Sequence, residues 1–123
     1  SLELRRATLE LIKRQIAELD RSDILNRTLA AIIDQLPSGG VSEGSVAKEL
    51  NLTVRTLRRK LSEKGIGFRS LLTNVRKDLV KRYIDDPSYT VTEISFLLGY
   101  TDTSAFSRAF KRWNGISPTQ ARL

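Results

Sequence analysis

The 123-residue chain contains no cysteine, no histidine and no methionine. Without cysteine it has no disulfide framework and no thiolate ligand, and without histidine it lacks the commonest metal ligand and the commonest general base at neutral pH. Zinc fingers, thiol redox chemistry and histidine-based catalytic triads are therefore excluded. No apolar run approaches the ~20 residues that span a bilayer, and the start lacks the layout of a signal peptide. These absences predict a cytoplasmic protein, and the missing initiator methionine predicts a piece of a longer one.

Positive charge is in excess, and the excess is confined to one part of the chain. Lysine and arginine number 21 against 14 aspartates and glutamates, which gives a net charge of +7 and a pI near 10.1. Residues 1–23 hold five basic and five acidic residues, so the whole excess lies in residues 24–123. This balance favours a polyanionic partner, with nucleic acid as the leading candidate.

Helical periodicity runs through nearly every segment, and none shows the strict alternation of a half-buried strand, so the predicted fold class is all-α. The first segment places apolar residues at five of six a and d heptad positions: Leu2, Leu9, Ile12, Ile16 and Leu19, with Arg5 at the sixth. This stripe fits pairing with a second copy. It also fits packing on this domain or on an absent portion of the parent protein, and the residues leave these alternatives open.

Polar caps and helix breakers divide the rest of the chain into short amphipathic helices. The residues predicted to cap helix starts are Ser42, Thr53, Thr90, Asp102 and Ser117. The predicted ends or breaks are at Pro37, Leu50, Gly65, Ile84 and Gly115. The longest predicted helix runs from about Phe68 to Ile84, roughly 25 Å at 1.5 Å per residue.

The second half of this region repeats the first. An offset of 48 residues places Thr90 on Ser42, and one extra residue in the turn then places Phe106 on Leu57. Each half therefore has a capped helix, a short turn and a second capped helix, which is the layout of a helix-turn-helix unit.

The second half also carries a set of residues at fixed spacings: Ile94, Gly99, Tyr100, Phe106, Ser107, Arg108, Phe110, Lys111, Gly115, Pro118 and Arg122. This set resembles the C-terminal signature of the AraC/XylS family of bacterial transcription regulators. The first half resembles the more variable part of the family pattern through Ala47, Leu50, Thr53, Leu57, Arg59 and Gly65. The likeness covers roughly residues 24–123, and the N-terminal helix lies outside it. Ser95 stands where the family usually has alanine, so its hydroxyl needs a hydrogen-bond partner.

The resemblance implies two helix-turn-helix subdomains on a rigid linker helix, with an extra N-terminal helix. Their second helices would enter successive major-groove segments on one face of the duplex. The corresponding division is an N-terminal linker helix (1–23), a first subdomain (24–67), a linker helix (68–86) and a second subdomain (87–123). The implied function is sequence-specific binding of double-stranded promoter or operator DNA in the nucleoid, with no metal or cofactor. RNA polymerase and a second copy of the full-length protein are further candidate partners.

Base reading needs side chains that reach base edges from an exposed helix face, and a guanidinium can meet guanine O6 and N7 with two bonds. The expected DNA-binding residues of the first unit are Arg55, Thr56, Arg58 and Arg59. Those of the second are Thr103, Ser104, Ser107, Arg108 and Lys111, with Arg108 as the main base reader because short hydroxyls favour phosphate and water-mediated contacts. The alternatives are a solvated face for the first cluster and an internal salt bridge for Arg108. The basic residues expected to contact phosphate or simply to aid solubility are Lys60, Lys64, Arg69, Arg76, Lys111 and Arg112.

Two other classes of function are weighed against DNA binding. An enzyme has little support, because the sequence shows no nucleophile-and-base pairing, P-loop or dinucleotide-binding glycine pattern, and we predict no catalytic residue. The Asp85-Asp86 pair before Pro87 is typical of a polar helix end. A helical protein-interaction module is the other alternative, and it predicts weak DNA binding without sequence preference.

Overall fold

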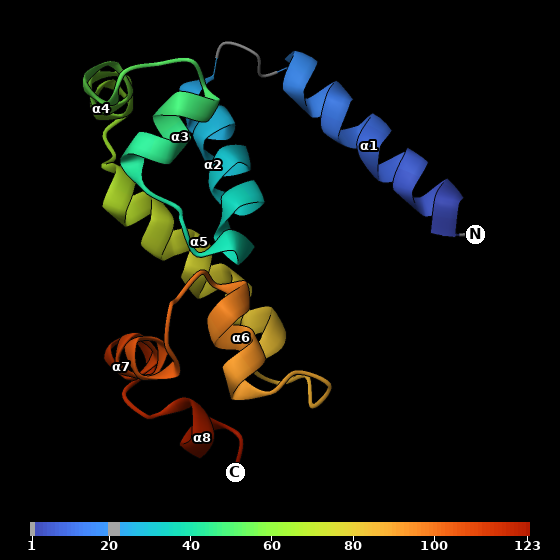
Figure 1. Ribbon diagram of the computed structural model, residues 1–123, viewed down its shortest axis with the longest axis vertical. Helices are drawn as coiled ribbons and strands as arrows, with labels where there is room; N and C mark the ends of the chain where they lie inside the picture. Colours follow the sequence, from blue (N-terminus) through green and yellow to red (C-terminus); the bar gives the residue numbers. More distant parts are fainter. Residues whose placement is uncertain (1, 20–22) are drawn as a thin grey trace.

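The computed structural model describes residues 2–19 and 23–123, with the side chains of residues 13 and 15–19 left out. All regular structure in these ranges is helical, which confirms the all-α prediction. The elements in chain order are α1 (Leu2–Leu19), α2 (Ile24–Gln35), the 3-10 turn η1 (Leu36–Ser38), α3 (Glu43–Glu49), α4 (Val54–Glu63), α5 (Phe68–Tyr83), α6 (Val91–Leu97), α7 (Thr103–Asn114) and α8 (Pro118–Ala121) (Figure 1).

The predicted caps determine where these helices begin. The side chain of each predicted cap residue accepts a hydrogen bond from the backbone N–H three residues on, which confirms Ser42, Thr53, Thr90, Asp102 and Ser117. Gly65 and Gly115 follow α4 and α7 with φ of +78° and +80°. This left-handed conformation ends a helix and is accessible to glycine at little cost.

The buried side chains form two core clusters that meet on α5. The first is built mainly from α2, α3 and α4, and it includes Phe68, Leu71 and Val75 of α5. The second is built from α6 and α7, and it includes Val80 of α5. Leu79 packs against both clusters. The predicted linker helix is therefore a structural member of both cores as well as a spacer between them.

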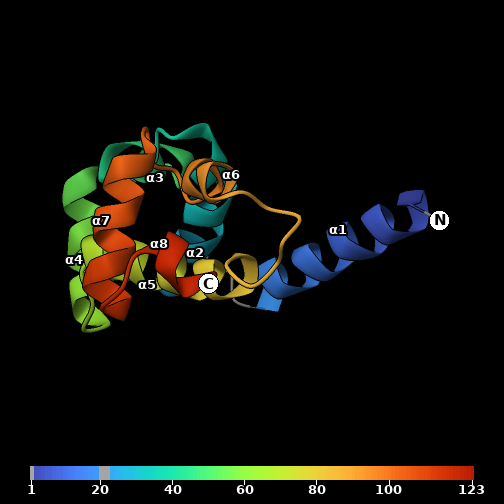
Figure 2. The same ribbon diagram turned by 90° about the horizontal axis from the view of Figure 1, so that it is seen from below.

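The N-terminal helix α1 stands apart from the other helices in both views (Figures 1 and 2). Its heptad residues Leu2, Leu9 and Ile12 are 64%, 56% and 45% exposed. These side chains are therefore not packed into the core of the chain. The side chains of Ile16 and Leu19, which complete the predicted stripe, lie outside the described residues.

Candidate nucleic-acid interface

Two helical hairpins, α3–α4 and α6–α7, present their second helices on the same side of the molecule. Figure 1 shows α4 and α7 nearly end-on, and Figure 2 shows both along their length on one edge. The turns between the paired helices correspond as well, because Asn51 and Gly99 both adopt positive φ, of 59° and 83°. Asparagine is among the residues that tolerate this conformation best after glycine. The sequence repeat is thus a structural repeat.

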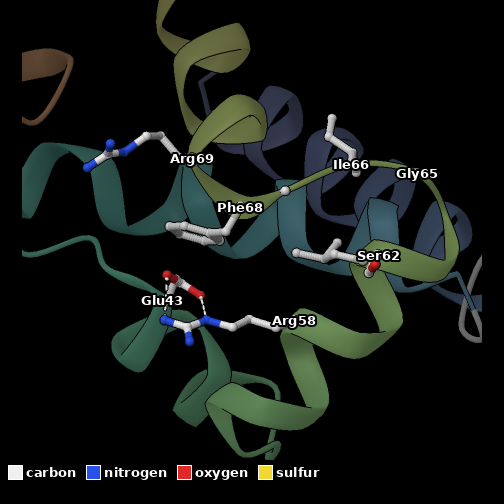
Figure 3. Close-up of a pocket in the computed structure, with 9 residues that line it drawn as sticks. Glu43, Arg58, Ser62, Gly65, Ile66, Phe68 and Arg69 are labelled. Atoms are coloured by element: carbon white, nitrogen blue, oxygen red, sulfur yellow. Dashed lines mark hydrogen bonds and ion pairs between the residues drawn. The ribbon is translucent and has the colours of Figure 1, made fainter.

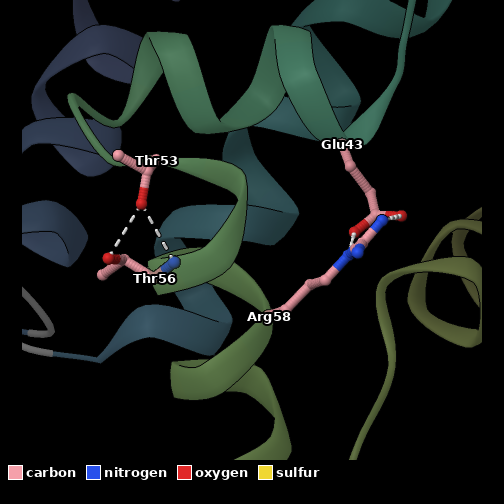
Figure 4. A network of polar contacts seen from close by, with 4 residues as sticks. All are labelled: Glu43, Thr53, Thr56 and Arg58. Atoms are coloured by element: carbon pink, nitrogen blue, oxygen red, sulfur yellow. Dashed lines mark hydrogen bonds and ion pairs between the residues drawn. The ribbon is translucent and has the colours of Figure 1, made fainter.

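The first of these helices, α4, is rich in exposed arginine. Arg55, Arg58 and Arg59 are all exposed, whereas Leu57 and Leu61 are buried against the first core. Thr56 is half-buried. Its backbone N–H donates to the Thr53 hydroxyl oxygen at 3.1 Å, and the Thr53 hydroxyl donates to the Thr56 hydroxyl oxygen at 2.9 Å (Figure 4). The hydroxyl proton of Thr56 can still be donated to a base or a phosphate. The helix therefore exposes a basic face and buries an apolar one.

Arg58 makes a bidentate ion pair that the sequence did not reveal. Its Nε donates to Oε2 of Glu43 at 2.6 Å, and Nη2 donates to Oε1 at 3.2 Å (Figure 4). These hydrogen bonds hold the pKa of Glu43 below its ordinary value and raise the pKa of Arg58. The Arg58 side chain is 66% exposed, so water can solvate both partners when the pair opens. Arg58 is consequently oriented across the start of α3 without being buried.

An open groove of about 600 Å³ lies beside this pair, between α4 and the start of α5. Glu43 and Arg58 lie at one side of it, and Phe68 and Arg69 of α5 lie at another (Figure 3). Arg69 is exposed and adds to the lowering of the Glu43 pKa. With one carboxylate and two guanidinium groups, the groove continues the positive charge of α4.

The second helix, α7, exposes fewer long side chains. Ser104, Arg108 and Lys111 are exposed, Thr103 and Ser107 are half-buried, and Phe106 and Phe110 are buried in the second core. Arg108 makes no ion pair with any described residue. Arg108 is therefore not held in a salt bridge with a described residue, contrary to that alternative. Its guanidinium is available to a partner.

Arg76 and Arg122, which contribute to the positive charge of the chain, have internal roles. Arg76 of α5 donates from Nε to the Leu98 carbonyl at 2.8 Å and lies over the Tyr100 ring at 4.3 Å. Arg122 donates from Nε to the Ile84 carbonyl at 3.0 Å, at the end of α5. Burial raises the pKa of Tyr100, and the charge of Arg76 opposes that rise. The expectation that Arg76 contacts phosphate or aids solubility is thus wrong, because its charged head is used within the fold.

The described residues show neither a cluster of metal ligands nor a membrane-spanning helix. No group of three or more acidic side chains that could hold a metal ion occurs among them. None of the helices described is long and apolar enough to cross a membrane. Ser95 is fully buried, and its hydroxyl donates to the Asp102 carbonyl at 3.2 Å. This hydrogen bond gives the buried Ser95 hydroxyl the partner that the sequence predicted it would need.

Two helix-turn-helix hairpins with basic second helices on one side define a bipartite DNA-binding domain. The helix-turn-helix domain family matches residues 46–123, which is well over half of the chain. The chain belongs to this family, and within it to the AraC/XylS type.

Known relatives are regulators of transcription that are much longer than this chain. An HTH-type transcriptional regulator of Mycobacterium tuberculosis is 45% identical over 75 residues, which cover 61% of this chain and 22% of the regulator. The ornithine utilization regulator of Pseudomonas aeruginosa is 32% identical over 120 residues, 94% of this chain and 35% of that protein. The solved C-terminal domain of AraT, a response regulator from Geobacillus stearothermophilus, superposes with a TM-score of 0.72 at 32% identity, covering 81% of this chain and 84% of that domain. The chain thus spans about a fifth to a third of these two full-length relatives.

Proposed function

We propose that this domain binds double-stranded DNA by inserting α4 and α7 into successive major-groove segments on one face of the duplex. The observation that carries the proposal is the placement of α4 and α7 on the same side of the molecule, with α5 between the two hairpins. Sixteen residues of α5 span about 24 Å at 1.5 Å per residue. Recognition helices that dock one helical turn apart need a separation of about 34 Å, and α5 together with the hairpins at its ends can supply it.

The proposed division of labour follows from exposure and side-chain chemistry. Arg55 and Arg59 make no ion pair with a described residue, and their guanidinium groups can read guanine directly. Arg58 reads a base once its ion pair with Glu43 has opened, or it contacts the phosphate backbone of the DNA while still paired with Glu43. On α7, Arg108 is the base reader, and the proposed contacts to phosphate and water come from Thr103, Ser104, Ser107 and Lys111. The proposed boundaries of the binding units are 24–67 and 87–123, with 68–86 as linker helix and 1–23 as N-terminal helix.

Selection from randomised duplexes of about 25 base pairs tests this function. The expected result is a retained motif with two blocks about 10 base pairs apart, one block for each recognition helix. A single block would mean that only one hairpin reads bases. Salt-sensitive retention without any enriched sequence would leave only attraction to phosphate and would contradict the proposal.

Replacement of Lys111 by alanine is expected to weaken binding on every duplex alike. An exposed lysine on α7 that contacts phosphate releases a counterion, so its loss lowers the slope of log affinity against log salt by about one. The measurement is a titration of the selected and a scrambled duplex at several salt concentrations. Lys81→Ala, at an exposed position of α5, is the matched control and leaves the slope unchanged. If Lys111→Ala also leaves it unchanged, Lys111 is not a phosphate contact.

The activity proposed for the parent protein is regulation of transcription in the bacterial cytoplasm, at the nucleoid. The relatives support this proposal, since they are named as regulators and this chain matches only a part of each. RNA polymerase is a proposed partner of the parent protein at the promoter.

The proposed partner of α1 is the same helix of a second copy. Its heptad spacing and the exposure of Leu9 and Ile12 support a two-helix seam. Sedimentation equilibrium of the chain is expected to show a concentration-dependent dimer that Leu9→Glu abolishes. Leu11→Glu is the control, because Leu11 is equally exposed, at 53%, but lies off the a and d positions. A chain that stays monomeric at about 100 μM, or a dimer that survives Leu9→Glu, would exclude this seam.

A further inference from the structure

The first unit (24–67) and the second unit (87–123) contact each other where the turn after α6 meets η1. Gly99 adopts a φ of +83°, and a Cβ added there would lie 2.7 Å from the Leu36 carbonyl oxygen and 3.1 Å from Leu36 Cδ2. The backbone of the second unit is thus pressed onto the backbone of the first. Leu36 and Leu98 are 1% and 0% exposed, so the contact is dry and closely packed. A side chain at position 99 requires the backbone of the turn or of η1 to shift.

A clamp from α5 holds the same turn in place. The Arg76 Nε–H donates to the Leu98 carbonyl, and the guanidinium lies over the ring of Tyr100, so this side chain contacts the residue before Gly99 and the residue after it. Arg76 is half-buried, and both contacts are stronger in a partly desolvated setting than in water. The turn is therefore fixed from two sides, by η1 and by α5.

We propose that the Leu36–Gly99 contact and the Arg76 clamp form a joint that makes the domain selective for the spacing between its two DNA half-sites. This inference rests on the proposed function. One extra base pair displaces the second half-site by about 3.4 Å along the duplex and rotates it by about 35°. A rigid joint prevents α7 from following that displacement, whereas a loose one lets each hairpin bind its own half-site. Gly99 and Arg76 are positioning residues in this account, since they act through the placement of α7.

Gly115 provides a matched control for the substitution of Gly99. It lies in the same unit with a φ of +80°, so alanine introduces similar backbone strain at either position. A Cβ at Gly115 meets no atom within 4 Å. Any effect of Gly99→Ala beyond that of Gly115→Ala therefore comes from the collision with Leu36. Arg76→Met provides a second variant, which keeps a long side chain but removes the donor and the charge.

The first test measures the placement of α7 without DNA. Because the chain contains no cysteine, Glu63→Cys on α4 and Arg112→Cys on α7 give a unique pair of spin-label sites, both exposed. Pulsed electron spin resonance is expected to give one narrow distance distribution in the otherwise unchanged chain and with Gly115→Ala. With Gly99→Ala and with Arg76→Met, the distribution is expected to shift or broaden. A distribution that stays narrow and unshifted in folded Gly99→Ala and Arg76→Met chains would overturn the proposal, because α5 alone would then set the geometry.

The second test measures the consequence for DNA. The probes are the duplex obtained by selection and two versions with one base pair added or removed between its blocks. The unchanged chain is expected to lose about tenfold or more in affinity at either altered spacing, as bivalent binding is lost. Gly99→Ala is expected to bind the selected duplex more weakly, and to bind all three duplexes within about twofold of one another. Retention of the full spacing preference by Gly99→Ala and Arg76→Met would overturn the proposal.

The two tests separate failure of this inference from failure of the proposed function. If selection returns a single block or none, bivalent docking fails, and the spacing selectivity proposed here fails with it. The spin-label distances then still show whether the joint holds the two hairpins. If two blocks are returned and the distances do not respond to Gly99→Ala or Arg76→Met, bivalent docking stands and only the joint is overturned.

Discussion

Replacement of Phe106 by alanine is expected to lower the free energy of unfolding by about 3–5 kcal/mol. Phe106 is fully buried, and its ring lies 5.8 Å from that of Tyr100 and 6.0 Å from that of Phe110. The substitution removes this aromatic packing and leaves a cavity at the centre of the second core. Domains of this size are held by only about 5–15 kcal/mol, so the loss is a large share of the total. Urea denaturation followed by circular dichroism measures it.

Phe96→Ala is the matched control for this prediction. It removes the same side chain from the same unit, but Phe96 is 52% exposed on α6, so the expected change is under about 1 kcal/mol. Similar losses for the two variants would show that Phe106 is not at the centre of a packed core. They would also remove the basis for treating α6 and α7 as one firmly held hairpin.

Replacement of Arg59 by alanine is expected to weaken binding of the selected duplex by about 5- to 150-fold, which corresponds to roughly 1–3 kcal/mol. Arg59 is exposed on α4 and makes no ion pair with a described residue, so it can give two hydrogen bonds to one guanine. Selection repeated with the variant is expected to lose its preference at one position of the first block. A titration of the selected and a scrambled duplex measures the difference in affinity.

Arg59→Lys separates base reading from simple charge attraction. Lysine keeps the positive charge but lacks the planar fork that matches guanine, so binding of the scrambled duplex is retained while the preference for the selected one falls. If Arg59→Ala weakens binding of selected and scrambled duplexes equally, Arg59 contacts phosphate and does not read a base.

The local features of the fold could be predicted because they depend on residues close together in the sequence. Ser42, Thr90 and Ser117 bind the backbone three residues on, and each partner at that position returns the bond. Gly115 ends α7 through its own backbone conformation. The hairpin repeat follows from the same local signals, because matched caps and turns place equivalent helices at equivalent positions.

The contacts between elements could not be predicted, since they join residues that no local pattern relates. Glu43 lies 15 residues before Arg58, and Leu98 lies 22 residues after Arg76. An arginine in the sequence shows its charge but does not show whether its head is used inside the fold. The sequence therefore places Arg76 among the cations expected to contact phosphate or aid solubility, whereas its half-burial and its two contacts depend on how α5 and α6 pack together.

The candidate DNA contacts fall between these cases. The exposure of Arg55, Arg59 and Arg108 follows from helical periodicity, because the apolar residues of α4 and α7 must face the cores. The bases they read depend on the duplex and on the placement of α7 relative to α4, which the helix pattern does not contain. Their assignment as readers therefore stays a prediction.

Hydroxyl-radical footprinting on the selected duplex tests the central claim most directly, because it reports which sugar positions the protein covers. Docking of α4 and α7 on one face predicts two protected segments about 10 base pairs apart, both on the same side of the duplex. Arg108→Ala is expected to weaken the second segment while the first persists. One continuous protected stretch, or two segments offset by about half a turn so that they lie on opposite faces, would contradict docking of two recognition helices on one face.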